Sequence, residues 1–406
     1  MTNRRDFFKQ ASVLTAGGLV GSSILSGCGG GISQGSASNL PSKKINYGLY
    51  DVHVHAGGGS GLQAFLEAGE KFIDETVQLS AVNLLVYNGN SPRSLSAHLM
   101  SLALKTVDPR YTAYGGFGYW LPCDGAGLRA QLEDMMEAGF DGLKMIEGKP
   151  TNRRNDPDLA LDHPRYNGVG ELLQETGYHI INHVNDPEEF WDQEKCPEWA
   201  NGGNGGYWDT EKFLTKEQHY EENERWLERY PDMNITYAHA YFLSNFPDRM
   251  EALFEKFPNM AIDLTPGIEM FDGFTKQRDR WIPFFIKYQD RILFGTDNRV
   301  SPFEQNVGHD ASYYDRIAYM RRFLETDDKF EAWGYDLHGF ALPENVLNKI
   351  YSENVLRRRG PVKAVVPAKA LKYANKLYAE ARDRDEVSDI SKQEIREVIE
   401  FFEKRV

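Results

Sequence analysis

Cysteine is scarce in this chain, because only Cys28, Cys123 and Cys196 occur among its 406 residues. So few cysteines exclude a disulfide framework of the kind that staples small secreted domains. The sequence does not show whether Cys123 and Cys196 lie close together, so their redox state stays open.

Positive charge is also in short supply. Lys and Arg total 46 against 60 Asp and Glu, which gives a net charge of −14. Binding to nucleic acid is therefore not expected, since it requires Lys and Arg to neutralise phosphates. Hydrophobic residues make up 41% of the chain, which is ample for a buried core and argues against disorder.

No hydrophobic run is long enough to span a membrane. The N-terminus carries Arg4 and Arg5, followed by a modestly apolar stretch at 11–25 that is rich in Gly and Ser. This start resembles a twin-arginine export signal, and ILSGC resembles a lipobox cleaved before Cys28. A frayed amphipathic N-terminus is the alternative.

These motifs predict the outer organisation of the protein. Residues 1–27 form a twin-arginine lipoprotein signal, and 28–44 form a flexible Gly/Ser tether. We expect export to the periplasmic face of a bacterial membrane, with a lipid on Cys28 as the one membrane contact.

From residue 45 short apolar runs alternate with amphipathic stretches, the pattern of repeated βα units. Eight candidate strands are Gly48–His55, Ala81–Tyr87, Tyr111–Phe117, Gly142–Ile146, His179–His183, Ile235–Ala240, Ala261–Leu264 and Ile292–Gly295. Helical spacing marks Leu62–Val77, Leu128–Ala138, Glu217–Tyr230, Met250–Phe257 and Arg278–Tyr288. The pattern predicts an α/β fold, a closed (β/α)₈ TIM barrel over 45–360. An open doubly wound sheet is the alternative, although no glycine fingerprint follows the first strand.

A C-terminal helical extension is predicted at 361–406. Pro343–Arg359 reads as the helix that closes the barrel, and Ala368–Arg384 and Ser391–Lys404 as two further helices. Ser391 and Glu394 have the spacing of a capping box at the start of the last helix. We expect the extension to pack on the barrel, with partner binding as the alternative.

The strongest chemical signal is DVHVH at the end of the first strand. Residues two apart on a strand face the same way, so His53 and His55 point together into the barrel. Their place near the carboxyl end puts them at the mouth, where barrel enzymes keep their sites. Two imidazoles on one face are typical of a transition-metal site.

Three further polar residues end predicted strands. They are His183 in NHVND, His239 in TYAHA and Asp297 in FGTDN. Each could be a hydrogen-bonded structural residue on its own. Four strands that deliver such groups to one rim, including a carboxylate that is costly to bury alone, instead favour a metal site.

DVHVH, GLKM, NHVND, TYAHA and FGTDN occur here in the order found in the amidohydrolase superfamily. The chain resembles its amidohydrolase-2 branch of mononuclear hydrolases and decarboxylases over about residues 47–358. The resemblance implies one divalent transition metal, Zn²⁺ by expectation and Mn²⁺ or Fe²⁺ as alternatives. It makes His53, His55, His183 and Asp297 the ligands. It also makes His239 and Asp297 the residues that orient or deprotonate the metal-activated water.

Lys144, at the end of the fourth strand, has two interpretations. In binuclear relatives a lysine at this place is carbamylated and bridges two ions, whereas the amidohydrolase-2 branch often has the lysine without a second metal. We expect one metal, with Lys144 binding an anionic group of the substrate. Arg299, two residues beyond Asp297, is a second candidate for substrate binding.

The segment Asn185–Leu214 is the longest strand-to-helix connection and carries Trp191 and Trp208 around a glycine-rich NGGNGG run. A loop of this length over a barrel mouth often serves as a lid. We therefore count both tryptophans as candidate substrate contacts. The alternative is a surface loop packed by its own aromatic side chains.

These observations together predict a metal-dependent hydrolase that cleaves an ester, lactone or amide bond of a small molecule. A metal-dependent decarboxylase acting on a small carboxylic acid is the alternative, because the resemblance covers both activities. A non-catalytic, lipid-anchored binding protein is a third hypothesis, and a homo-oligomer is possible.

Overall fold

The computed structural model describes residues 48–75, 79–86, 89–196, 207–266, 268–301, 311–332 and 334–406. The predicted export signal at 1–27 and the tether at 28–44 lie outside these residues. No helix among the described residues is long and apolar enough to cross a membrane.

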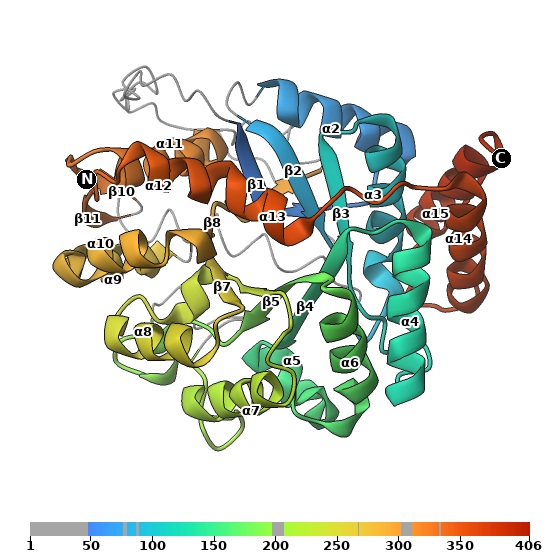
Figure 1. The fold of residues 1–406 in the computed structure, drawn as a ribbon. Helices are drawn as coiled ribbons and strands as arrows, with labels where there is room; N and C mark the ends of the chain where they lie inside the picture. Colours follow the sequence, from blue (N-terminus) through green and yellow to red (C-terminus); the bar gives the residue numbers. More distant parts are fainter. Residues whose placement is uncertain are drawn as a thin grey trace, which may run out of the picture.

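Parallel strands form one curled sheet at the centre of the molecule, as Figure 1 shows. In the 9-stranded sheet each strand from β1 to β8 neighbours the next, and β9 pairs with the free side of β1. The strands are β1 (Leu49–Ala56), β2 (Leu79–Leu85), β3 (Tyr111–Gly115), β4 (Gly142–Gly148), β5 (His179–Val184), β6 (Ile235–Tyr237), β7 (Met260–Asp263), β8 (Ile292–Leu293) and β9 (Asn298–Val300).

Backbone hydrogen bonds join the two ends of this sheet. Val52 of β1 donates to the carbonyl of Phe294, just beyond β8, at 3.1 Å, and the Asp297 N–H donates to the His53 carbonyl at 2.9 Å. The predicted (β/α)₈ barrel is thereby confirmed, and the strand bounds agree with the predicted ones within a few residues.

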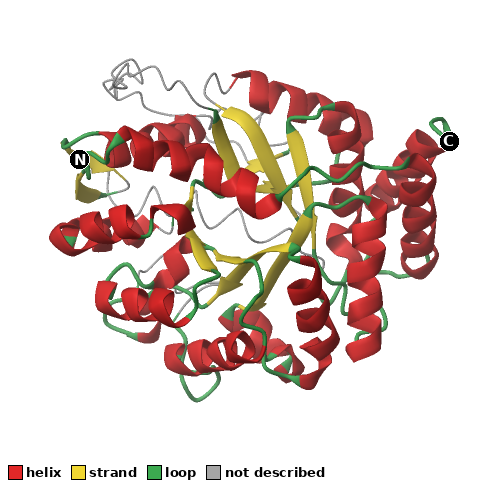
Figure 2. Cartoon of the chain, in the orientation of Figure 1, coloured by secondary structure: helices red, strands yellow, loops and turns green. Residues whose placement is uncertain are grey.

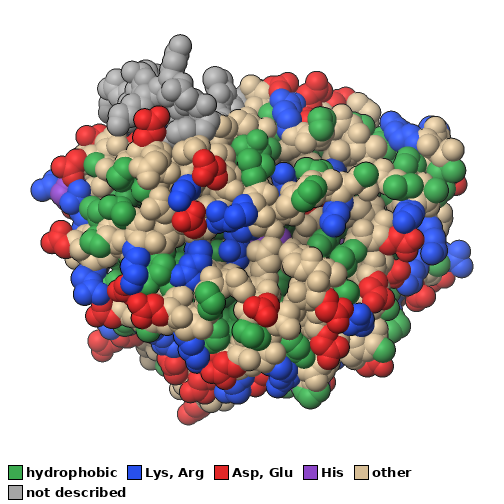
Figure 3. Space-filling model, viewed as in Figure 1, with side chains coloured by type: hydrophobic (Ala, Val, Ile, Leu, Met, Phe, Trp, Pro, Cys, Tyr) green, Lys and Arg blue, Asp and Glu red, His purple; other side chains and the backbone are tan. Residues whose placement is uncertain are grey.

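Helices surround the sheet, as Figure 2 shows. They are α2 (Leu62–Glu75), α3 (Leu95–Val107), α4 (Gly125–Ala138), α5 (Pro150–Asn155), α6 (Asn167–Thr176), α7 (Lys216–Arg229), α8 (Pro247–Lys256), α9 (Ile268–Lys276), α10 (Arg278–Lys287) and α11 (Ala311–Glu325). A hairpin of β10 (Lys329–Ala332) and β11 (Tyr335–His338) precedes α12 (Glu344–Asn348), a π-helical turn (Lys349–Glu353) and α13 (Asn354–Arg359). The surface in Figure 3 mixes acidic and basic side chains, as expected for a charged, soluble exterior.

The C-terminal extension forms α14 (Pro367–Ala381) and α15 (Asp389–Glu403), which pack on each other and against α4 and α3. This cover explains α3, whose residues from Leu95 to Lys105 are all buried. A helix that is buried on every side, with polar residues such as His98 and Lys105 also inside, has no clear amphipathic stripe in the sequence. For that reason α3 was not among the predicted helices.

The predicted capping box of the last helix is wrong. The N-cap is Ser388, whose hydroxyl accepts a hydrogen bond from the Ser391 N–H. Helix α15 therefore begins one turn earlier than predicted, and Glu394 lies inside it with its carboxylate directed elsewhere. The prediction failed because both serines are favourable N-cap residues, and the Glu three residues after Ser391 pointed to the wrong one.

A buried ion pair links α3 to Asp141, the residue directly before β4. The Lys105 ammonium lies 2.6 Å from the Asp141 carboxylate, and both side chains are almost fully buried. Asp141 also accepts from the backbone N–H groups of Ala113 and Lys363. Burial lowers the pKa of Lys105, and the Asp141 charge opposes that shift.

We expect Asp141→Asn to lower the free energy of unfolding by about 3–5 kcal/mol, because it leaves the buried Lys105 charge uncompensated. Adding Lys105→Met should restore much of that loss. Urea unfolding measures both, with Lys376→Met as control, since the exposed Lys376–Asp134 pair should contribute less than about 1 kcal/mol. A loss in Asp141→Asn no larger than in the control would contradict this account.

Candidate metal centre

Three side chains of β1 face the barrel interior in alternation: Asp51, His53 and His55. The Asp51 carboxylate accepts hydrogen bonds from the backbone N–H groups of His53 and Thr296, each at 3.0 Å. The Thr296 hydroxyl donates to the same carboxylate. Asp51 therefore fixes the β1 backbone against the segment that carries Asp297.

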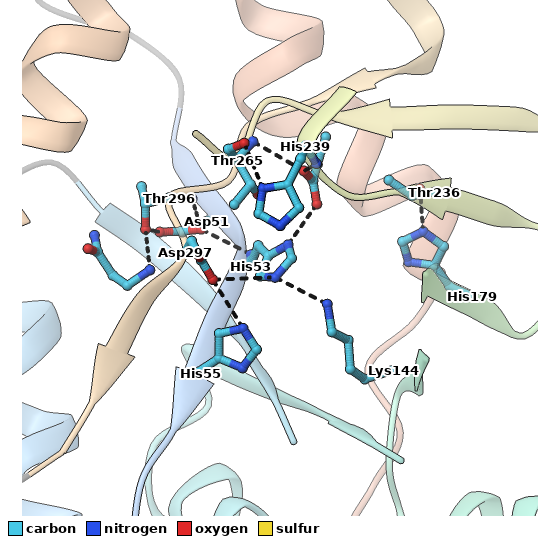
Figure 4. Close-up of polar contacts among 12 residues, drawn as sticks. Asp51, His53, His55, Lys144, His179, Thr236, His239, Thr265, Thr296 and Asp297 are labelled. Atoms are coloured by element: carbon cyan, nitrogen blue, oxygen red, sulfur yellow. Dashed lines mark hydrogen bonds and ion pairs between the residues drawn. The ribbon is translucent and has the colours of Figure 1, made fainter. Parts of the chain in front are cut away.

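His53, His55 and Asp297 come together at the mouth, as Figure 4 shows. The Nε2 atoms of His55 and His53 lie 3.1 Å and 3.7 Å from Asp297 Oδ1. One ligand atom from each residue fits within 4.8 Å of the others, and this is the one group of three or more such residues found among the described residues. Two imidazoles and a carboxylate at this spacing suit a divalent transition metal.

Asp263 at the end of β7 was missed in the sequence and supports this group from within the barrel. Its carboxylate is fully buried and lies 2.9 Å from His53 Nδ1. It also accepts from the backbone N–H groups of His239 and Thr265. Burial raises the pKa of Asp263, but the charge and hydrogen bond of His53 outweigh burial and bring it to about 2.

The ionised Asp263 decides which nitrogen of His53 carries the proton. A carboxylate only accepts, so His53 Nδ1 holds the hydrogen and Nε2 presents a lone pair toward Asp297. A carboxylate behind a ligating histidine is the usual arrangement in metal sites. The signal was available in the sequence, because Asp263 interrupts the apolar run MAIDL and lies next to the end of the predicted strand Ala261–Leu264.

His183 and His239 lie next to this group, with their ring centroids 4.8 Å apart. The His239 ring is 5.5 Å from that of His53. His183 is not in the three-residue group, since its Nε2 donates to the Asn185 carbonyl at 3.0 Å. Its role as a fourth ligand stays a prediction.

Candidate residues at three strand ends have left-handed backbone conformations. Asn185 has φ 74°, Asp297 has φ 57°, and the four residues 239–242 have φ between 46° and 57°. Such conformations cost roughly 1–2 kcal/mol for each L-residue other than glycine. At Asp297 the turn is held by Arg316 of α11, which donates to the carbonyls of Thr296 and Asp297.

The pKa shifts show which groups stay charged without a metal. Burial lowers the pKa of His55 and His239, so both rings are neutral near pH 7. For Asp297 burial acts upward, but the hydrogen bond from His55 and the nearby histidines hold its pKa well below the usual value. Neutral imidazoles beside an ionised carboxylate are the protonation states that metal binding requires.

Of the two basic candidates for substrate binding, Lys144 directly contacts the candidate centre, and Arg299 lies on the neighbouring strand β9. Lys144 Nζ lies 3.2 Å from His53 Nε2, and burial lowers its pKa to about 8. Arg299 sits on β9 beside His55, its register partner on β1. Lys144 thus shares the space in front of the His53 ligand atom, which is where a substrate group would compete with it.

The predicted lid residues belong to a separate aromatic cluster. Trp208 is buried and packs against Phe190 and Phe213, with ring centroids 5.9 Å and 4.7 Å away. Trp191 Nε1 donates to the Leu214 carbonyl. This packing agrees with the alternative interpretation, in which the loop is packed by its own aromatic side chains. Contact of Trp208 with a substrate would require the cluster to open. Cys123 and Cys196, the latter in this cluster, are both free thiols.

The candidate metal centre does not coincide with the cavity at α9 and α10. A cavity of about 470 Å³ lies at the junction of α9 and α10 and is lined by Thr275, Lys276, Gln277, Arg278, Asp279, Arg280 and His338. None of these is a predicted site residue. Side-chain chemistry, rather than concavity, identifies the site.

Comparison with solved structures finds distant likenesses among its matches. The IDCase of Metarhizium anisopliae in its apo form has 13% identity and a TM-score of 0.46, covering 77% of this chain and 97% of that one. An amidohydrolase from Mycobacterium avium subsp. paratuberculosis K-10 has 14% identity and a TM-score of 0.39, covering 72% and 74%. An amidohydrolase from Mycoplasma synoviae has 10% identity and a TM-score of 0.39, covering 84% and 96%. No curated protein sequence matches the chain.

The family comparison is more direct. The sequence pattern described as Amidohydrolase, of the amidohydrolase-2 type, matches residues 50–357. The matched segment begins at the second residue of β1, contains β2 to β9 and includes all of the residues discussed at the mouth. The chain therefore belongs to the amidohydrolase family, in its amidohydrolase-2 branch.

Proposed function

We propose that this protein is a metal-dependent hydrolase that cleaves an ester, lactone or amide bond of a small molecule. One divalent ion, Zn²⁺ by expectation, would be held by His53, His55 and Asp297, with His183 as a fourth ligand. The observation that carries the proposal is the His53–His55–Asp297 group, with the His53 ring held by the buried Asp263.

Such an ion, when bound, lowers the pKa of water from 15.7 toward about 7 and polarises a carbonyl group. The residues around it then have separate tasks. Asp263 keeps the His53 proton on Nδ1, and Asp51 fixes the backbone on which His53 sits. His183 joins the set only if its Nε2 leaves the Asn185 carbonyl or its Nδ1 is used.

His239 is the residue we assign to proton transfer. Its Nδ1 donates to the Thr265 carbonyl at 3.2 Å, so Nε2 carries the free lone pair. The ring stacks on Phe242, with 5.0 Å between centroids, and this contact fixes its plane. Nε2 can therefore accept a proton from water in the mouth and return it to the leaving group.

The substrate class follows from the basic groups. Lys144 projects into the same space as the ligand atoms and would bind an anionic group of the substrate. Arg299 lies on β9, where it is the register partner of His55. We therefore expect a small substrate that carries a carboxylate or a similar anion near the bond to be cleaved.

The first prediction concerns metal content. Purified protein should hold about one divalent ion per chain, and His53→Ala and Asp297→Asn should each lose it, because each removes a ligand. Elemental analysis with His163→Ala, a change at a partly exposed histidine outside the centre, provides the control. Full metal content in both ligand variants would refute the assignment.

The second prediction concerns Asp263→Asn. The Asn oxygen would keep accepting from the His239 and Thr265 N–H groups, which turns its NH₂ group toward His53 Nδ1. The His53 proton then moves to Nε2, the ligand atom, so metal affinity should fall about 10–100-fold. Chelator competition measures the affinity. Asp141→Asn, the same change at a buried site away from the centre, should leave it unaltered.

The third prediction tests the reaction. In a panel of esters, lactones, amides and carboxylic acids, we expect metal-dependent hydrolysis without release of CO₂. His239→Asn should lower kcat by about 10²–10⁴-fold because it removes the proton acceptor, while metal content stays the same. Release of CO₂ without hydrolysis would make the protein a decarboxylase, and activity unaffected by removal of the metal would rule out both reactions.

A further inference from the structure

The loop between β1 and α2 is held by a residue more than three hundred positions away. Residues 57–61 read Gly-Gly-Gly-Ser-Gly and directly follow the end of β1. The backbone N–H groups of Gly59, Ser60 and Gly61 all donate to one atom, Glu394 Oε1 of α15, at 2.5, 2.9 and 3.1 Å. The next N–H, that of Leu62, donates to Glu397 Oε2 at 2.7 Å.

The chemistry of this contact explains why a carboxylate is found there. Consecutive N–H groups at a helix N-terminus form a positively polarised concavity that favours an anion. Helix α2 has no acidic residue in its first turn, and the residue before it is a glycine without a side chain. Glu394 and Glu397 therefore cap α2 from another part of the chain.

The contact is buried and tightly fitted. Glu394 is 1% exposed. A Cβ atom at Gly58 would come within 2.8 Å of Ser96 Oγ on α3 and 2.9 Å of Glu394 Oε2. Gly61 has φ +90°, a conformation that side chains disfavour. The glycines thus let the loop backbone approach α15 closely enough for three N–H groups to reach one oxygen.

The other end of the loop is tied to the metal centre. The Gly57 N–H donates to the Val300 carbonyl of β9 at 2.9 Å, and His55 is in register with Arg299 of the same strand. Asp297 lies immediately before β9. His55 is the second of the two candidate ligands on β1, and only residues 56–58 separate it from the N–H groups that Glu394 holds.

We propose that Glu394 is a positioning residue of the metal centre: α15 fixes residues 59–61 and, through them, the end of β1 from which His55 projects. The proposal rests on the proposed function for its consequence in metal binding. It makes the C-terminal extension a structural component of the active site, in addition to a cover for α3.

The test compares three variants in the full-length protein. Glu394→Ala removes the acceptor, Glu394→Gln keeps an Oε1 that can accept from the same N–H groups, and Val398→Ala weakens the packing of the same helix at a fully buried position without touching the loop. The measurements are urea unfolding, Zn²⁺ affinity by chelator competition, and amide hydrogen exchange of residues 53–57 in metal-free protein. Glu394→Asp, shorter by one methylene, replaces the alanine variant if that variant does not fold.

We expect both alanine variants to be less stable. Only Glu394→Ala should weaken Zn²⁺ binding, by about tenfold, and accelerate exchange at 53–57, while Glu394→Gln should stay close to wild type. Unchanged affinity and exchange in Glu394→Ala, or equal losses in Val398→Ala, would overturn the proposal. If the wild-type protein binds none of Zn²⁺, Mn²⁺ and Fe²⁺, the proposed function fails, and exchange at 53–57 alone decides whether Glu394 holds the strand end.

Discussion

The buried carboxylate of Asp263 is the constraint on which the mouth of the barrel depends. A buried, ionised carboxylate is costly unless hydrogen-bond donors surround it. Here the donors are the His53 ring on β1, the His239 N–H after β6 and the Thr265 N–H after β7. Satisfying one charge therefore sets the tautomer of His53, the place of the His239 backbone and the turn after β7. The arrangement of His53 in the candidate metal centre is a consequence of this electrostatic requirement.

Not every histidine at the barrel interior serves the centre, and the partners tell them apart. His179 at the start of β5 is fully satisfied by the Tyr114 hydroxyl at 2.7 Å and the Thr236 hydroxyl at 2.8 Å, both neutral groups in a packed interior. It has a structural role. His53 and His55 instead face the Asp297 carboxylate across a shared space, and the His53 Nε2 atom also lies 3.2 Å from the Lys144 ammonium. The left-handed turn at Asp297, held by Arg316, is consistent with strain retained for function.

Much of the barrel could be predicted from the sequence, because its strands are short apolar runs and the candidate ligands lie at or near the ends of these runs. His53, His55 and Asp297 were found in this way, since strand alternation and strand ends are local properties. Asp263 obeyed the same rule and was overlooked among apolar neighbours. The role of Glu394 could not have been found, because its partners lie 333–335 positions away. The local capping-box pattern assigned Glu394 a wrong role, at the start of its own helix. Helix α3 was missed because burial on every side leaves no periodic signal.

A hydrogen bond that closes the barrel also joins the two segments of the candidate centre. The Asp297 N–H donates to the His53 carbonyl at 2.9 Å, so the two ligand-bearing segments are joined through their backbones before any side chain acts. Asp51 joins them again through Thr296, and Arg316 and Glu394 hold the segments that follow. These supports act mainly on backbone groups, whereas the candidate ligand atoms contact one another and Lys144: His55 Nε2 lies 3.1 Å from Asp297 Oδ1, and His53 Nε2 lies 3.2 Å from Lys144 Nζ. Because β1 is fixed from both neighbouring strands and from α15, the distance between His55 and Asp297 is set by the fold rather than by the ion.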